Sequence, residues 1–549
     1  MKQQSHTGIR KRLISLITAM VLLAVFCTGC SSAAPQKDAA AGDTAGAAAQ
    51  AEAEARDAAA AETTAADAAP VGETAQVTAA PETAAQQETP QAPDVSDAYT
   101  LKKVVILSRH NIRAPLSGEG SFLSTATPHT WFQWTADTSQ LSLRGGILET
   151  MMGQYFRKWL ESEELIPENY QPEDGEVRFY ANAKQRTQAT ARYFASGMLP
   201  VAIVDIERHA DYDTMDETFT PKLHFLNDAY EKTAMEEISA FGGDKGLEGL
   251  DSQMTDAYAL LEDVLDLQDS EAYKKGELTG FTPGNIQIKL NLDEEPGMEG
   301  DLKTATQLAD ALVLQYYEEE DPKEAAFGHN LTMEDWQTLD SIKELYSKIL
   351  FTSTAVAVNV AQPLLVEIKN ELQEENRRFT FLCGHDSNVA SVLAAMGVEE
   401  YSLPGTVERD TPIGVKLVFE VYEGPDQQDY CRIRLVYQTT RQIRELEPLD
   451  LDTPPASFAP DFRGMEKNAD GLYLLEDVYT RIQEALDLYD TLSLTAGSAE
   501  EAATAAPAAE EAAPAEAGTE APAREEGTEE APAEEPAPEE TGEAVDDAA

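Results

Sequence analysis

Two arginines flank a histidine where an apolar run ends near residue 108. The apolar residues 104–107 are followed by Ser108, Arg109, His110, Asn111, Ile112 and Arg113. Guanidinium groups bind phosphate or carboxylate oxygens through paired N–H donors. A neutral imidazole is a nucleophile that needs neither a thiolate nor a metal ion. The types and spacing of Arg109, His110 and Arg113 therefore predict an anion site with a candidate nucleophile inside it.

Two later stretches carry the same kinds of side chain. Arg186 follows an alternating stretch at 177–182, and His385 and Asp386 follow the apolar residues 379–383. Arg186 alone is equally well an ordinary surface arginine, and a His-Asp pair before a helix is often only a helix cap. Two histidines that each follow a strand-like run are harder to explain in this way. We therefore expect Arg186, His385 and Asp386 to complete the same site.

Three strands and the helices after them must position these groups. Residues 104–107 and 379–383 are short apolar runs typical of buried strands. Residues 177–182 predict a third strand, and 184–197 predict a helix that ends at a glycine before a proline. Ligands of open α/β sheets bind beyond the carboxyl ends of strands. With a predicted hairpin at 416–422 and 431–437, the pattern indicates one mixed sheet with an active-site edge.

Composition separates the folded part from its flanks. The chain has 549 residues and a net charge of −58, which argues against nucleic-acid binding. Residues 31–96 and 495–549 are rich in Ala, Glu, Thr and Pro with almost no apolar period, and such composition predicts a disordered linker and a disordered acidic tail. The folded region is expected at 97–494.

The cysteines and the spacing of possible metal ligands limit which metal or cofactor the chain is expected to hold. Cys383 and Cys431 lie in apolar, strand-like surroundings and are expected to be buried free thiols, although an exported chain also allows a disulfide. Outside the export segment, which ends in Cys27 and Cys30, no CxxC or HExxH spacing occurs, so we expect no metal and no other cofactor.

Residues 1–30 have the pattern of an export signal. Basic residues precede an apolar run at 13–26, and the segment ends at Cys30 after small residues. This ending resembles the lipobox of bacterial lipoproteins and implies a membrane anchor on Cys30, at the cell surface or in the periplasm. Cys27 stands where leucine is usual, so simple cleavage and secretion is the alternative. An uncleaved membrane-spanning anchor is less favoured because the run is short for a bilayer.

The motif at 109–115, Arg-His-Asn-Ile-Arg-Ala-Pro, and the Gly-His-Asp at 384–386 together resemble the histidine acid phosphatases. This is the branch of the histidine phosphatase superfamily that includes bacterial phytases. Asn111 replaces the glycine of the usual RHGxRxP motif, and this variant resembles the glucose-1-phosphatase group. Further matches follow in order at 145–146, 185–187, 214–216, 295–297, 385–388 and 409–414.

The resemblance implies a role for each candidate residue. His110 would attack phosphorus to form a phosphohistidine, and Asp386 would protonate the leaving oxygen. Four side chains would hold the phosphate: Arg109, Arg113, Arg186 and His385. The carboxylate of Glu295, on a short loop, would bind sugar hydroxyls.

The implied fold is a phosphoglycerate mutase-like α/β domain, a mixed sheet with helices on both faces. A smaller α-helical cap, mostly within about 200–300, would cover the site. The implied substrate is a small phosphomonoester, foremost glucose 1-phosphate and related sugar or inositol phosphates. A broad-specificity acid phosphatase or phytase is the alternative. A phosphoglycerate mutase-like transferase is a further candidate function, but the Gly-His-Asp motif argues against it. The last candidate is a non-catalytic surface lipoprotein.

Overall fold

Strand β1 (Thr100–Arg109) is an inner strand of a seven-stranded mixed sheet. The computed structural model describes residues 89–117 and 121–504. The strand order is β2-β5-β1-β6-β7-β8, and β9 pairs with β7. β1 and β2 run parallel to β5, whereas β6 to β9 pair antiparallel with their neighbours. The other strands of this sheet are β2 (Val177–Ala181), β5 (Phe379–Gly384), β6 (Lys416–Glu423), β7 (Asp429–Tyr437), β8 (Ala456–Phe458) and β9 (Tyr473–Leu474).

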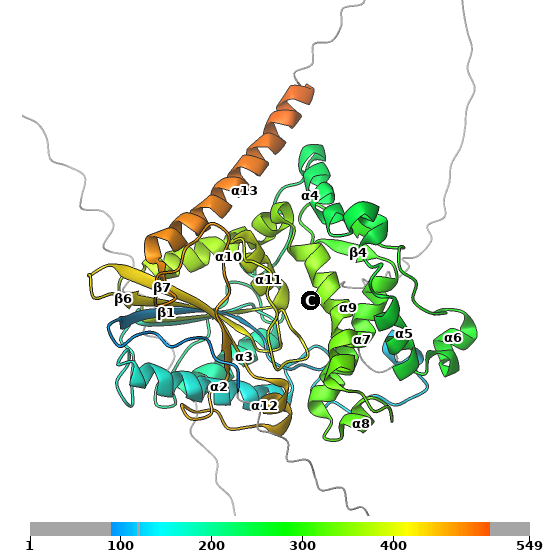
Figure 1. The fold of residues 1–549 in the computed structure, drawn as a ribbon, viewed down its shortest axis with the longest axis horizontal. Coiled ribbons are helices and arrows are strands. Elements are labelled where there is room, and N and C mark those ends of the chain that lie inside the picture. The colour runs from blue at the N-terminus through cyan, green and yellow to red at the C-terminus, as the bar shows by residue number, and fades with distance from the viewer. Residues whose placement is uncertain (1–88, 118–120, 505–549) are drawn as a thin grey trace, which may run out of the picture. The chain divides into compact units, whose positions relative to one another are not determined.

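The apolar run of β1 is buried because both faces of the sheet are covered. Successive side chains of a strand point to opposite faces. Val104 and Ile106 accordingly lie in one core with residues of α2 (Leu143–Ser162) and α3 (Gln185–Met198). Val105 and Leu107 lie in a second core with α10 (Thr354–Gln373), α11 (Asp386–Ala395) and α13 (Leu475–Thr504). Figure 1 shows α2 and α3 below the sheet and α10 and α13 above it. The expected mixed sheet with helices on both faces is confirmed.

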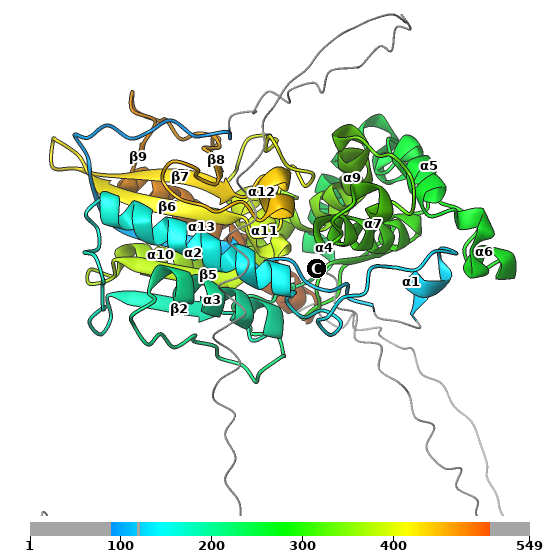
Figure 2. The ribbon, with the colours of Figure 1, turned by 90° about the horizontal axis from the view of Figure 1, so that it is seen from below.

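A helical part stands beside the carboxyl ends of β1 and β5 and has a third core of its own. Figure 2 shows its helices grouped to one side of the sheet. Its main helices are α4 (Asp228–Ala240), α5 (Thr255–Val264), α7 (Asp301–Glu318) and α9 (Met333–Phe351). Ile112, which follows the motif histidine by two residues, is fully buried in this third core. The loop after β1 is therefore held between the sheet and the helical part.

Short elements complete the described chain. They include the small hairpin β3 (Gln287–Lys289) and β4 (Gly297–Glu299). The short helices are α1 (Phe122–Thr125), η1 (Gly243–Gly249), η2 (Leu267–Asp269), α6 (Glu271–Lys275), α8 (Pro322–Ala325) and α12 (Thr440–Glu445). No single helix in the described ranges has the length and apolarity to cross a membrane, although α9 and α10, bent by 84° at their junction, meet these criteria as a pair.

The ends of the folded region differ from the expected boundaries at 97 and 494. Residues 89–96 pack on the sheet: the amide of Ala92 donates to Ser457 Oγ at 2.9 Å, and Arg432 Nη1 donates to the carbonyl of Pro93 at 3.0 Å. Helix α13 continues past residue 494 to Thr504. Composition did not reveal the first extension, because residues 89–96 are held largely through their backbone groups, which bond to side chains distant in the sequence. Cys383 and Cys431 are buried free thiols, as expected.

Candidate active site

The pairing of β1 with β5 brings the two histidine motifs together. Arg109 lies opposite Gly384 in the parallel register, and the backbone amide of His110 donates to the carbonyl of Gly384 at 3.0 Å. A Cβ at Gly384 would lie 2.3 Å from Asn388 Oδ1, so only glycine allows this close approach. The rings of His110 and His385 meet edge to face, with centroids 5.4 Å apart.

A backbone hydrogen bond sets the tautomer of His110. Its Nδ1 lies 2.8 Å from the carbonyl oxygen of Asn111. A carbonyl only accepts, so Nδ1 carries the proton and Nε2 of the neutral ring keeps its lone pair. Burial, followed by the charge of Arg186, lowers the pKa of His110 well below its usual value. The ring is therefore neutral and has an unprotonated Nε2 at mildly acidic pH.

His385 is oriented by a chain of side chains that begins at Asp216. The backbone amide of Asp216 donates to Asn182 Oδ1 at 2.9 Å, which fixes the amide so that Nδ2 donates to His385 Nε2 at 2.7 Å. The proton of the neutral ring then sits on Nδ1, which is buried and has no hydrogen-bond partner among the described residues. His385 thus keeps a buried N–H donor that no described residue uses.

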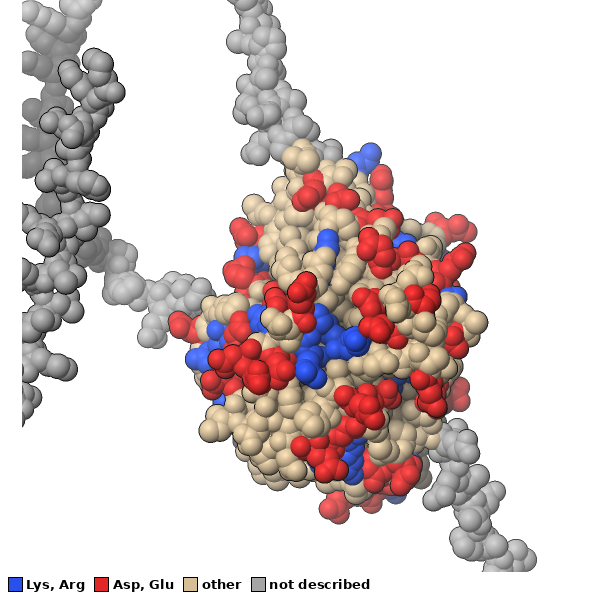
Figure 3. Space-filling model, turned by 90° about the vertical axis from the view of Figure 1, so that its left-hand side faces the viewer, with Lys and Arg blue, Asp and Glu red and all other residues tan. Residues whose placement is uncertain are grey.

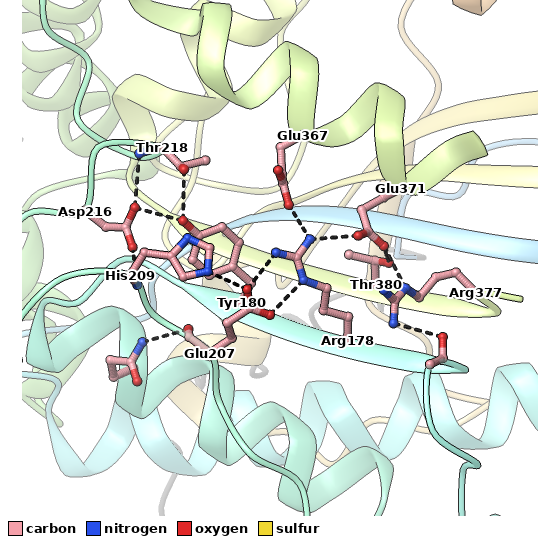
Figure 4. Close-up of polar contacts among 12 residues, drawn as sticks. Arg178, Tyr180, Glu207, His209, Asp216, Thr218, Glu367, Glu371, Arg377 and Thr380 are labelled. Atoms are coloured by element: carbon pink, nitrogen blue, oxygen red, sulfur yellow. Dashed lines mark hydrogen bonds and ion pairs between the residues drawn. The ribbon is translucent and has the colours of Figure 1, made fainter. Parts of the chain in front are cut away.

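A polar network on the far side of Asp216 supports this chain. Tyr180 donates from its hydroxyl to Asp216 Oδ1 at 2.8 Å, and the His209 amide donates to Asp216 Oδ2 at 2.7 Å. Figure 4 shows the network continuing through Glu207 to Arg178, which also pairs with two glutamates of α10, Glu367 and Glu371. Asp216 is therefore held by groups from outside the site, and Asn182 transmits that position to His385.

Asp386 is the first residue of α11 and lies between two cations. Arg109 Nη2 and Lys343 Nζ are each 3.2 Å from Asp386 Oδ2. Burial alone would raise the pKa of Asp386, but Arg109 and Lys343 outweigh burial and hold this pKa well below its usual value. Arg109 is also bound by Glu408 at 2.6 Å. In the free protein Asp386 is a carboxylate within a buried network of mixed charge.

The remaining arginines face the same space from two other elements. Arg113 Nη2 pairs with Asp310 Oδ2 of α7 at 3.1 Å. Arg186 is the second residue of α3, and its positive charge lowers the pKa of both His110 and His385, after burial. All six predicted residues are buried and converge: Arg109, His110, Arg113, Arg186, His385 and Asp386.

Asn111 uses its side chain for structure. Its Nδ2 donates to Glu149 Oε2 at 2.8 Å, and its Oδ1 accepts the amide of Ile112 at 2.9 Å. Glu149 pairs with Lys416 at 2.9 Å, and both of these side chains are fully buried. The Asn111 amide therefore points into a buried ion pair behind the nucleophile.

Two predicted residues stand apart from this group. Glu295 is half-buried in the loop before β4, next to Glu294, whose carbonyl accepts the Leu223 amide at 3.0 Å. The segment before Leu223 contains Phe219, whose carbonyl accepts from Asn388 Nδ2 of α11 at 2.9 Å. The loop of Glu295 is thus braced against the same segment as α11, and its contact with a sugar stays a prediction. Cys30 lies outside the described residues.

Sequence reasoning missed three charged residues around this group: Asp310 of α7, Lys343 of α9, and Glu408 of the loop between α11 and β6. Asp310, Lys343 and Glu408 all contact the predicted arginines or Asp386. Asp310 interrupts the apolar residues 308–314, and a charge inside an apolar helical run was a usable signal of a buried partner. Lys343 has ordinary helical neighbours, and no local pattern distinguishes it.

The arrangement is suited to transfer of a phosphoryl group. A neutral imidazole nitrogen lies among guanidinium donors, a histidine N–H and the start of α11, where a helix favours anions. A carboxyl group lies at the edge of the same space. Such a set binds a tetrahedral anion, attacks it, and exchanges a proton with the departing group. Within residues 89–117 and 121–504, no group of three or more His, Cys, Asp or Glu is arranged to hold a metal ion.

Comparison with known proteins assigns the family. The model of the histidine phosphatase superfamily (branch 2) matches residues 100–438. The glucose-1-phosphatase of Salmonella typhimurium is 36% identical over 390 residues, which cover 70% of this chain and 92% of that protein. The glucose-1-phosphatase of Providencia rettgeri is 34% identical over 70% of this chain and 92% of its own length.

A solved structure agrees. The phytase of Citrobacter braakii superposes with a TM-score of 0.64 at 27% identity, over 70% of this chain and 98% of that one. The fold and these relatives define a phosphomonoester hydrolase of the histidine phosphatase type. This chain belongs to the histidine phosphatase superfamily, branch 2.

Proposed function

We propose that this chain is a phosphomonoesterase that acts through a phosphohistidine on His110, with glucose 1-phosphate and related sugar or inositol phosphates as substrates. The observation that carries the proposal is the hydrogen bond from His110 Nδ1 to the Asn111 carbonyl, 2.8 Å long. It leaves Nε2 unprotonated among phosphate-binding groups. The likeness to two glucose-1-phosphatases supports the choice of a sugar phosphate.

The reaction follows from the positions of the side chains. Arg109, Arg113, Arg186 and His385 hold the phosphate oxygens. The Nε2 lone pair of His110 forms an N–P bond while the ester P–O bond breaks, and Asp386 gives its proton to the leaving oxygen. Water then attacks phosphorus, the N–P bond breaks, and the proton of the water returns to Asp386. The products are the alcohol and inorganic phosphate.

A phosphate that binds at Arg109 adds negative charge beside Asp386. This raises the pKa of the Asp386 carboxyl and favours the protonated form that the first step needs. Glu295 is proposed to accept hydrogen bonds from sugar hydroxyls. Export through residues 1–30, with lipid attachment at Cys30, is inferred from the sequence pattern of that segment.

The test combines a substrate panel with two variants. Wild-type protein should hydrolyse glucose 1-phosphate, and His110→Ala should lower kcat at least about 10⁴-fold because no other group can form the N–P bond. Asp386→Ala should lose about 10²–10⁴-fold on alkyl esters and far less on p-nitrophenyl phosphate, whose leaving group needs no proton. His329→Ala, in the helical part near Asp263, is the matched control and should keep wild-type rates.

The panel also decides between the two candidate substrates. Rapid phosphate release from inositol hexakisphosphate with no turnover of glucose 1-phosphate would replace the sugar-phosphatase proposal by a phytase. The likeness to the Citrobacter braakii phytase makes this the second candidate. Persistent turnover by His110→Ala would reject the phosphohistidine mechanism, whichever substrate is used.

A further inference from the structure

Lys343 joins the helical part to the proposed proton donor. Its ammonium lies 3.2 Å from Asp386 Oδ2, 3.2 Å from Asp310 Oδ1 and 3.6 Å from Glu408 Oε1. Its side chain is only 16% exposed. Lys343 comes from α9, whereas the other cation beside Asp386, Arg109, comes from β1. Asp386 is therefore held from both sides of the space between the sheet and the helical part.

We propose that Lys343 is a positioning residue for Asp386, which holds the carboxyl group at the leaving-group side of the phosphate site and sets the pH range of turnover. The inference rests on the proposed phosphatase function and adds a residue from the helical part to it. Lys343 acts through Asp386, and no contact between Lys343 and the transferred phosphoryl group is required.

The two cations beside Asp386 have different tasks when substrate binds. Arg109 is one of the phosphate-holding side chains, so its N–H donors are shared with the incoming oxygens. Lys343 is also tied to Asp310 and to Glu408, the acid that Arg109 contacts as well, and it stays beside Asp386. Lys343 then fixes the direction in which the Asp386 carboxyl group points while the leaving oxygen departs.

The charged and titratable groups that act on Asp386 come from several elements, and the acids Asp310 and Glu408 contact Lys343 beside it. Arg109 and His110 face it from the end of β1, His385 precedes it on the chain, and Lys343 faces it from α9. Burial favours the protonated carboxyl and the cations favour the carboxylate. Protonated Asp386 is the active form. Each cation lowers the pKa of Asp386 and therefore shifts the alkaline fall in activity to lower pH.

A cavity of about 360 Å³ borders this pair and supplies the control residue. Asp386, Lys343, Glu408 and Lys348 all line it. Lys348 lies on the same helix as Lys343 and carries the same charge, but it is exposed and its ammonium lies 5.5 Å from the ring of Phe241. Replacing Lys348 therefore removes an equal charge from the same cavity wall without removing the partner of Asp386.

The experiment measures kcat for glucose 1-phosphate against pH, because kcat reports the ionisation of Asp386 in the enzyme–substrate complex. Lys343→Met should move the alkaline limb to higher pH by about one unit, since an opposite charge at this distance typically shifts a carboxyl by about 1–3 units. In Lys343→Arg and in Lys348→Met, the alkaline limb of the pH profile should lie at the same pH as in the wild type. With p-nitrophenyl phosphate, Lys343→Met should cause little loss of kcat, because that leaving group departs without a proton.

Asp310→Asn tests the same inference in the opposite direction. It removes the negative charge that shares Lys343 with Asp386, so the limb should move to lower pH. This variant also keeps the test informative if Lys343→Met does not fold, which thermal melting of each variant would show.

The outcomes separate this inference from the function on which it rests. If the wild-type chain does not hydrolyse phosphomonoesters, the proposed function fails. If the wild type is active but the limb of Lys343→Met or Asp310→Asn does not move as stated, the role of Lys343 fails alone. A higher KM with an unmoved limb in Lys343→Met would make Lys343 a substrate-binding residue and would overturn the inference.

Discussion

Asn111 occupies the position directly after the nucleophile, but its side chain faces the protein interior. The amide bonds to Glu149, the backbone carbonyl accepts from His110, and the backbone amide donates to Thr190 Oγ1 at 3.2 Å. The residue is thus held on three sides. Any effect of Asn111 on substrate choice therefore passes through the orientation of the His110 ring.

Asn111→Gly should consequently damage catalysis more than specificity. Glu149 would lose a buried donor, which costs about 1–3 kcal/mol of unfolding free energy, and the carbonyl that orients His110 would be freer. We expect a lower kcat on every substrate and an unchanged ratio of kcat/KM between glucose 1-phosphate and inositol hexakisphosphate. A ratio that shifts tenfold or more would show instead that the Asn111 side chain selects the substrate.

The start of α2 is the element on which the loop after β1 rests. A Cβ at Gly145 would lie 2.4 Å from the backbone oxygen of Ile112, so the helix and this loop touch without a side chain between them. At the neighbouring Gly146, the atoms nearest to a Cβ would be those of the Tyr193 side chain, from 3.0 Å, and Tyr193 is 44% exposed. The two glycines therefore stand in the same helix with neighbours of different rigidity.

Alanine at these two positions should have opposite effects. Gly145→Ala must displace backbone beside Asn111 and should cost about 1–3 kcal/mol together with most of the activity. Gly146→Ala needs only a movement of Tyr193 and gains about 0.5–1 kcal/mol of helix propensity, so it should be as stable as wild type or more so. Urea unfolding and glucose 1-phosphate turnover measure both. Equal losses in the two variants would show that α2 tolerates no change there for reasons other than the Ile112 contact.

Sequence reasoning succeeded best in predicting the strands and helices. Runs such as 104–107 and 379–383 predicted strands because burial on both faces leaves a continuous apolar signal. Arg109, His110 and Asp386 followed because they lie at the ends of those strands. The position of Asp310 in an apolar run could mark it as buried, but neither Asp310 nor Lys343 could be assigned its partner, since they meet Arg113 and Asp386 only after α7 and α9 have packed beside the sheet. Asn182 was passed over for the same reason: its partner His385 is 203 residues away.

At the scale of the whole molecule, the strongly acidic composition contrasts with a buried site that holds several cations. The chain carries a net charge of −58, and Figure 3, which views the molecule from the left-hand side of Figure 1, shows acidic side chains spread over that face around a smaller group of Lys and Arg. The arginines and Lys343 of the site lie inside, offset by Asp310, Asp386 and Glu408. The field of the whole molecule disfavours a highly anionic ligand, so a substrate with a single phosphate approaches at a smaller cost than one with six.

Stability of the whole molecule should also depend on pH through Asp410, which lines the cavity beside Asp386. Burial, followed by the charge of Glu344, raises the pKa of Asp410 to about 7, against about 3.9 in an unfolded chain. Between these values the folded state holds a proton that the unfolded state has released. The free energy of unfolding therefore falls as pH rises from about 4 to about 7.

Asp410→Asn removes this dependence because an amide stays neutral. At pH 4 the variant and the wild type should be about equally stable, whereas above pH 7 the variant should be more stable by about 1–3 kcal/mol, after allowance for partial exposure. Asp426→Asn is the matched control: hydrogen bonds from Gln428 and Tyr430 lower the pKa of Asp426, so its replacement should bring no gain above pH 7. Urea unfolding at several pH values measures all three proteins. A gain for Asp410→Asn that is the same at pH 4 and pH 8 would mean that the amide packs better, and that Asp410 holds no proton in the folded state.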